Sequence, residues 1–449
     1  MHRICFAAVI ALVAAAPLSA AETFLLTGTS NSGTTWLVVN EVTGKGTFEF
    51  QQGTGSDKPA SHPIELTATF RHTERRLPSA GRDEAAYRSL RNYEVAKSEV
   101  RVGGQLSSPS LRNERSRIVV RIDGGLLSPW SPQGPLTPKE LELLPSLGDP
   151  LLLSALLPDR AVAVGENWTP AAWVGPALAG AEVALNGQVN CQLDAVRDGK
   201  AIIRVTGKIN GATKGATSET KLDGVLHYDL KSAAIANAEL TQIEERSIGP
   251  LMPGMSLTLK SAVRRTPAPA SAAFSDADLA AIPATPPTEM LRLEHLTSFG
   301  VALQCDREWM PFHQTGQLLV LRLLDRGGLI AQCNLTPAPT VTPGKRTSDQ
   351  EFQEDIVRTL GDQLTKILSA EEVRLPSGPA IYRVTAVGSA GGAERVWKYY
   401  LVTAAGGQQA ALVFTAEPAT LDRLGDRDME LVKSLVFVAP DEPTPAAPL

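Results

Sequence analysis

Apolar and polar residues alternate in short runs through the first half of the chain, between Glu22 and about Arg265. Most of these runs end at Gly, Asn or Asp, a pattern typical of half-buried antiparallel strands joined by tight turns. It predicts strands over 36–39, 47–50, 64–70, 118–122, 189–193, 201–205, 225–230, 238–243 and 257–259. Because Thr43-Gly44-Lys45-Gly46 separates the first two, they are predicted to form a hairpin, and the strands together to form a meander.

A short helical insertion interrupts these strands. Thr137, Pro138 and Glu140 have the spacing of a capping box with proline at the first helical position. A second apolar stretch, 151–157, stops at Pro158. Helices this short need a surface to pack on. We therefore expect residues 22–265 to form one β-rich domain, a curved, half-barrel-like antiparallel sheet partly wrapped around the insertion.

Residues 266–290 are rich in Pro and Ala and predict an extended linker, with at most one helical turn capped by Ser275. Beyond it, strands resume, and Ser348 with Glu351 forms another capping box. The helix that follows is predicted to carry one apolar stripe, made of Phe352, Ile356, Val357, Leu360, Leu364, Ile367 and Leu368. With a last helix over 420–433, residues 291–438 predict an α/β sandwich of antiparallel sheet and two helices. The fold class is therefore α+β, and the Pro-rich end, 439–449, predicts a disordered tail.

The N-terminus has the order of a secretory signal peptide. His2 and Arg3 precede an apolar run that ends at Leu18, and small residues lead to Ala21. We expect cleavage after residue 21 and a periplasmic or secreted mature protein. Cleavage leaves three cysteines, Cys191, Cys305 and Cys333. If the strands that carry Cys305 and Cys333 flank a third strand, about 9–10 Å separates their backbones, too far for a disulfide. This order predicts that all three thiols are reduced, whereas direct pairing of the strand of Cys305 with the strand of Cys333 would allow a disulfide.

Charge excludes one class of partner. The chain has 43 basic and 48 acidic side chains among 449 residues, and no basic stripe dominates any segment. We therefore expect no nucleic acid partner. Apart from the N-terminus, no apolar run is long enough to span a bilayer, so the mature protein is not predicted to be an integral membrane protein.

Motifs that carry chemistry are absent from the sequence. The histidines are isolated, and neither a nucleophile elbow nor a phosphate-binding or dinucleotide-binding loop occurs. Asp306 and His313 follow Cys305, so thiol catalysis is one interpretation of this cysteine. The pattern favours the other interpretation, a small residue packed on a strand. The sequence therefore predicts no catalytic residues, no cofactor and no metal. The candidate partner contacts are bulky residues in a predicted loop, Trp309, Met310, Phe312 and His313. The pattern favours the other reading, in which this segment folds back over a sheet edge as part of the core.

Two parts of the chain resemble known proteins. Asp306-Arg307-Glu308-Trp309, the capped helix from Ser348, Trp397-Lys398-Tyr399-Tyr400 and the ending 432–437 are similar to the PsbP/Mog1-like α/β sandwich of bacterial exported proteins. The run 158–168 resembles uncharacterised exported proteins of planctomycete-type bacteria. Because PsbP/Mog1-like domains act mostly as protein-binding or assembly factors, the resemblance implies a binding role.

Three functions follow as hypotheses. The favoured one is an exported, non-catalytic binding or assembly protein with a protein or cell-envelope partner. The alternative is a carrier of a lipid or another apolar ligand, held inside the half-barrel. A hydrolase with a site assembled from distant loops is the third. A lined cavity of several hundred Å3 on the concave face would distinguish the carrier.

Overall fold

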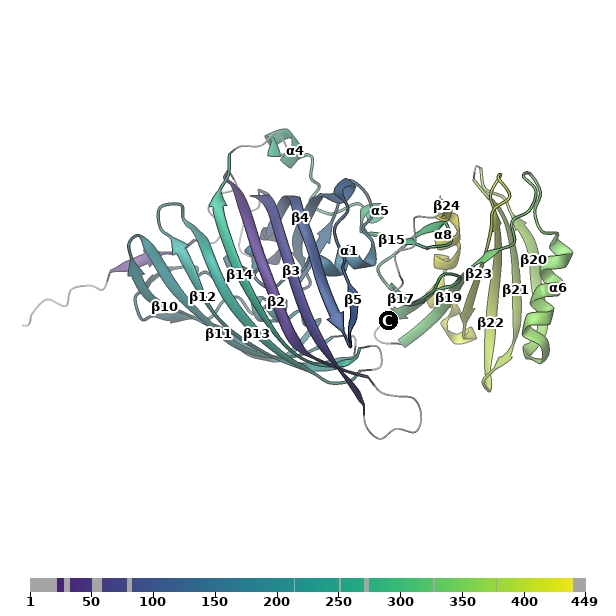
Figure 1. Ribbon diagram of the computed structural model, residues 1–449, viewed down its shortest axis with the longest axis horizontal. Coiled ribbons are helices and arrows are strands. Elements are labelled where there is room, and N and C mark those ends of the chain that lie inside the picture. The colour runs from purple at the N-terminus through teal and green to yellow at the C-terminus, as the bar shows by residue number, and fades with distance from the viewer. Residues whose placement is uncertain are drawn as a thin grey trace, which may run out of the picture.

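The computed structural model describes residues 22–27, 33–50, 59–78, 83–213, 215–249, 252–269, 274–325, 328–376 and 378–438. The predicted signal peptide, 1–21, and the predicted tail, 439–449, lie outside the described residues. Strands predominate, and the chain is broadly α+β, with a large sheet in its first half and a smaller one in its second (Figure 1). Within the described residues none of the sheets closes on itself.

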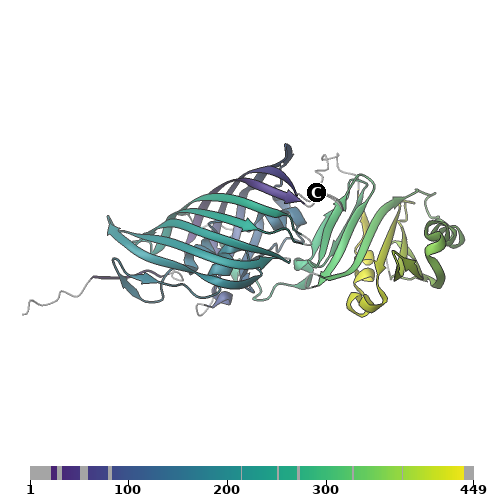
Figure 2. The same cartoon turned by 90° about the horizontal axis from the view of Figure 1, so that it is seen from below.

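The large sheet is antiparallel and has twelve strands, in the order β7-β6-β4-β3-β2-β14-β13-β12-β11-β10-β9, with β5 paired to β4. Figure 2 shows that it curves strongly along its length. Its strands are β2 (Thr35–Phe50), β3 (Ala60–Arg76), β4 (Arg88–Val102), β5 (Gln105–Ser107), β6 (Arg117–Asp123), β7 (Leu126–Trp130), β9 (Asn167–Trp168), β10 (Val183–Arg197), β11 (Lys200–Thr213), β12 (Ala216–Asp229), β13 (Ala234–Arg246) and β14 (Gly254–Pro267). A separate pair, β1 (Thr23–Leu25) with β8 (Ala161–Ala163), lies beside it.

Three short helices pack against one face of this sheet: α1 (Pro138–Leu143), α2 (Pro150–Ala155) and α3 (Val174–Ala179). The predicted capping box is confirmed, because Thr137 Oγ1 accepts from Glu140 N and Glu140 accepts from Thr137 N. All six residues of α2 are buried. Apolar side chains from the three helices and from ten strands of the sheet form one core cluster, so side chains fill the space between helices and sheet.

The predicted hairpin at residues 43–46 is wrong. β2 is one continuous strand that pairs along its whole length with β3 on one side and β14 on the other. The sheet is therefore not a simple meander, because the first long strand of the domain pairs with the last. A Cβ at Gly46 would lie 1.9 Å from Ser256 O, and one at Gly44 would lie 2.7 Å from Leu259 Cδ2. The glycines thus permit close approach within the sheet instead of making a turn.

The segment predicted as an extended linker is not free of contacts. Thr266 and Pro267 belong to β14, and the next residues form α4 (Asp276–Ala280), capped by Ser275 as predicted, and α5 (Thr288–Leu291). Phe274 and Leu279 are buried in a cluster with Leu77, which follows β3, and with Leu90, Val119 and Trp130 of the large sheet. Residues 274–291 are therefore anchored to the β-rich domain.

The second half contains a seven-stranded antiparallel sheet in the order β17-β18-β19-β23-β22-β21-β20, and a small sheet in the order β15-β16-β24. The strands are β15 (Leu293–Leu296), β16 (Val301–Cys305), β17 (Trp309–Gln314), β18 (Leu319–Asp325), β19 (Gly328–Ala338), β20 (Leu364–Val373), β21 (Ala380–Ala390), β22 (Ala393–Thr403), β23 (Gln409–Ala416) and β24 (Val436–Phe437). Helix α6 (Asp349–Leu360) covers one face, while α7 (Leu421–Leu424), α8 (Arg427–Lys433) and the small sheet pack on the other. Single 3-10 turns complete the chain, at η1 (Glu84–Ala86), η2 (Asn113–Arg115), η4 (Gly361–Gln363) and η5 (Pro418–Thr420).

Two predictions for this half are corrected. The apolar stripe does not run along one helix, because α6 ends at Leu360 and Gly361 has a φ of 49°. Leu364, Ile367 and Leu368 lie in β20 instead. The meander argument for the thiols is also wrong, because Cys305 lies in the three-stranded sheet and Cys333 in the seven-stranded one. All three thiols are nevertheless free and buried.

Contacts join the two halves near β15. Arg112 donates to Glu140 of α1 and to Glu294 of β15, over 2.8 and 2.7 Å. Glu294 N donates to Leu136 O at 2.9 Å, and Arg307 Nη2 donates to Pro129 O at 2.8 Å. The junction is therefore a polar interface with charge-assisted hydrogen bonds.

Candidate functional site

The predicted partner contacts lie on β17, which is an edge strand and not a loop. Among the described strands β17 pairs with β18 alone. Trp309 is 1% exposed, and its ring meets Phe414 edge to face at a centroid distance of 5.8 Å. Trp309 is thus a core residue and no partner contact, while Met310 is half-buried.

Phe312 and His313 are exposed, as a contact surface requires. Phe312 is 49% exposed and sits in a bulge between Pro311 and His313. The Arg322 guanidinium lies 3.3 Å from the centroid of the Phe312 ring, and Arg322 Nε donates to Gln332 Oε1 at 3.1 Å. We call Phe312, His313 and Arg322 the β17 surface. An aromatic ring stacked on an oriented arginine is the type of pair that is enriched in protein interfaces.

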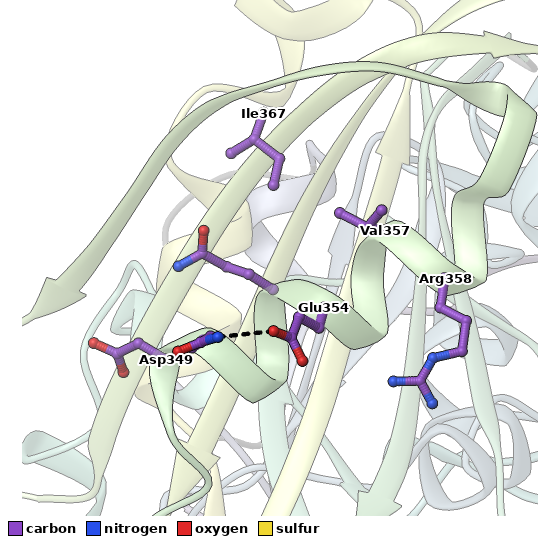
Figure 3. Close-up of a pocket in the computed structure, with 7 residues that line it drawn as sticks. Asp349, Glu354, Val357, Arg358 and Ile367 are labelled. Carbon is purple, nitrogen blue, oxygen red and sulfur yellow. Dashed lines mark hydrogen bonds between the residues drawn. The ribbon is translucent and has the colours of Figure 1, made fainter.

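A second surface was not predicted from the sequence. An open groove of about 630 Å3 lies between α6 and β20 and is lined by Asp349, Gln350, Gln353, Glu354, Val357, Arg358 and Ile367 (Figure 3). Val357 is 46% exposed, and in Figure 3 it faces the same space as Ile367. The sequence missed this α6–β20 groove because it assigned 364–368 to the helix.

The most strongly charged cluster is sealed inside the β-rich domain. Arg91 of β4 donates to both carboxylate oxygens of Asp149, at 2.7 and 2.8 Å, and to Glu74 of β3 at 3.0 Å. Arg265 of β14 lies 3.5 Å from Glu74. Asp149 also caps α2, because it accepts from Leu151 N at 2.9 Å. We call Glu74, Arg91, Asp149 and Arg265 the buried ion cluster, and its geometry anchors α2 to the sheet.

Burial and charge perturb the groups of this cluster. Burial would raise the pKa of Glu74, but Arg91 and Arg265 outweigh it and hold that pKa below its ordinary value. Burial, followed by the charge of Arg91, lowers the pKa of the adjacent His72 well below its ordinary value. Perturbed groups often mark active sites. Here, however, the side chains of Glu74, Arg91 and Asp149 are each only 1% exposed, so a substrate has no approach to them.

The thiols are likewise poor candidates for chemistry. Burial raises the pKa of Cys191 to about 12, and burial with the charge of Asp306 raises the pKa of Cys305. A thiol, and not the nucleophilic thiolate, is therefore present at neutral pH. Within the described ranges no group of three or more His, Cys, Asp or Glu side chains could hold a metal ion.

Comparisons with known proteins assign no family. No family model matches the chain, and no curated protein matches it. Among solved structures, the chain is similar to cyanobacterial PsbP from Synechocystis, with 14% identity over 32% of this chain and 92% of that one, at a TM-score of 0.27. It is also similar to DynF of the dynemicin biosynthesis pathway of Micromonospora chersina, with 10% identity over 54% of this chain and 84% of that one, at a TM-score of 0.14. TM-scores this low carry no functional argument. In the described part of the chain, no helix is both long and apolar enough to cross a membrane.

Proposed function

We propose that this is an exported, non-catalytic binding or assembly protein that engages a protein or cell-envelope partner through the β17 surface. The observation that carries the proposal is the pair of Phe312 and Arg322. The ring is about half exposed, and the guanidinium is held over it by Gln332. Burying such a ring and its arginine in a partner would supply apolar area and a directed cation in one place.

In this proposal the two halves have different tasks. The N-terminal sheet, half-barrel-like around its helices, is a rigid scaffold fixed by the buried ion cluster. The C-terminal unit is a PsbP/Mog1-like sandwich that presents the binding surface. Export to the periplasm or beyond follows from the signal peptide predicted over residues 1–21.

The alternatives have less support. A lipid carrier needs a lined space on the concave face of the sheet, and that face is packed with side chains of α1, α2 and α3. A hydrolase needs polar groups that converge at an accessible place, whereas the polar cluster around Arg91 is buried.

Native mass spectrometry of the protein purified from its own envelope fraction tests the proposal, because it separates a protein partner, a lipid and no ligand. We expect a protein to co-purify with the wild type and to be lost from both Phe312→Ala and Arg322→Ala. Leu106→Ala is the matched control, because Leu106 is 49% exposed on β5 of the other domain. Recovery of lipid alone, or undiminished partner in both β17 variants, would contradict the proposal.

A further inference from the structure

The outer edge of β20 carries hydrogen-bonding groups that the sheet does not use. Among the described strands β20 pairs with β21 alone. Its first half is bulged, but from Ser369 to Val373 the register with β21 is regular. Along such a stretch, alternate residues direct N–H and C=O groups away from the sheet. Another extended chain could therefore pair with it.

Helix α6 forms a wall beside this edge. Ile367 of β20 pairs with Ala386, whose side chain belongs to the cluster that α6 covers. Val357, on the opposite wall, is 46% exposed. Arg346 lies 3.0 Å from Asp349 at the start of α6 and 3.5 Å from Glu372 of β20. The helix start therefore lies beside the regular part of the strand, and α6 and β20 run in opposite directions.

The charge of the groove selects the occupant. Asp349 and Glu354 line it, and its one lining cation, Arg358, lies 2.6 Å from Asp355 of the same helix. Among the described residues, Glu354 accepts a hydrogen bond only from the neutral side-chain amide of Gln350, at 2.9 Å. Because Asp349 is paired with Arg346, Glu354 is the lining carboxylate without a cationic partner among the described residues, and it lies beside an apolar centre. A second copy of this chain would bring another Glu354 to the same place, and the two carboxylates would repel each other.

We propose that the α6–β20 groove binds an extended peptide segment that adds a strand to the free edge of β20. Its backbone pairs with Ser369–Val373, an apolar side chain packs on Val357 and Ile367, and a lysine or arginine meets Glu354. Strand addition beside a helix obtains affinity from main-chain hydrogen bonds and specificity from alternate side chains. This surface is distinct from the β17 surface, so the proposal does not depend on the function proposed above.

The test uses a short synthetic peptide, capped at both ends, with the sequence Thr-Lys-Thr-Val-Thr-Lys-Thr. This order reads the same in both directions, so it does not assume parallel or antiparallel pairing. Binding to the full mature chain is measured by fluorescence anisotropy, and protection of the β20 amides by hydrogen exchange. We expect saturable binding and new protection within 369–373. Replacing lysine by glutamate, or methylating the backbone nitrogens, should weaken binding at least about tenfold.

Charge reversal makes the test specific. Glu354→Lys should weaken binding of the lysine peptide by about tenfold and should strengthen binding of the glutamate peptide. Thr359→Lys is the matched control, because Thr359 is exposed on the same helix but does not line the groove. Phe312→Ala should leave peptide binding unchanged, which separates this proposal from that for the β17 surface. Absence of binding, equal binding of the methylated peptide, protection outside β20, or a dimer that pairs through β20 would each overturn the proposal.

Discussion

Arg91 is a fully buried charge, and we expect its ion pairs to contribute to the stability of the β-rich domain. Its partners Asp149 and Glu74 are as buried as it is, so removing one partner leaves a charge without compensation. We predict that Asp149→Asn lowers the free energy of unfolding by about 3–5 kcal/mol. Asparagine caps a helix as well as aspartate does, so the loss reports the ion pair and not the cap of α2.

Denaturant unfolding measures this loss, and an exposed ion pair supplies the control. Arg204 is 59% exposed and lies 2.7 Å from Asp194. Arg204→Gln should change the free energy of unfolding by less than about 1 kcal/mol. Similar losses from the two substitutions would show that the buried ion cluster does not anchor α2.

His295 gives the protein a predicted acid sensitivity. Burial lowers its pKa to about 4, and its Nε2 has no hydrogen-bond partner among the residues that the structure describes. In the unfolded chain a histidine titrates near 6.5, so between these two values the unfolded state binds more protons. Stability should therefore fall as pH decreases from about 6.5 to about 4, by up to about 3 kcal/mol from this group. His295→Phe should flatten that part of the profile in thermal unfolding, and an equally steep profile in the variant would refute the assignment.

At the scale of the element, one apolar stripe with helical spacing in the sequence is split between two elements, the helix α6 and the strand β20. Leu360 is 7% exposed in the core beneath α6, whereas Leu368 is 53% exposed on β20. Leu360→Ala should lower the free energy of unfolding by about 2–5 kcal/mol. Leu368→Ala, the same chemical change, should alter it by about 0.5 kcal/mol or less. Calorimetry on both variants measures these changes. Equal losses of stability would indicate that both leucines lie on one long helix.

At the scale of the whole molecule, the main cores of the two halves do not share side chains. Both clusters of the C-terminal unit consist of residues between 299 and 437, and the main cluster of the first half lies between 24 and 263. We predict that the isolated fragment 288–440 folds alone. Its circular dichroism and cooperative thermal transition should match those of the same unit in the full chain. A fragment without a transition would show that the contacts of Arg112 and Arg307 are indispensable to it.

The sequence by itself determined features that depend on neighbouring residues. Alternation predicted most strands of the twelve-stranded sheet. Thr137, Ser275 and Ser348 cap the helices that follow them, because a cap needs only side chains three residues apart. Phe312 and His313, named from the sequence as candidate partner contacts, are exposed, although the pattern favoured a folded-back position for them. Trp309 was not separated from them, because its burial depends on Phe414, which is distant in the chain.

Only the tertiary structure decided features that depend on distant partners. Pairing with β14 and β3 keeps β2 one continuous strand through glycines that locally favour a turn. Gly361 ends α6, and pairing with β21 makes β20 a strand although its apolar spacing continues the helical period. The buried ion cluster and the α6–β20 groove likewise join residues from separate elements. Local sequence fixes backbone preferences of a fraction of a kcal/mol per residue, and long-range packing and pairing override them wherever the two conflict.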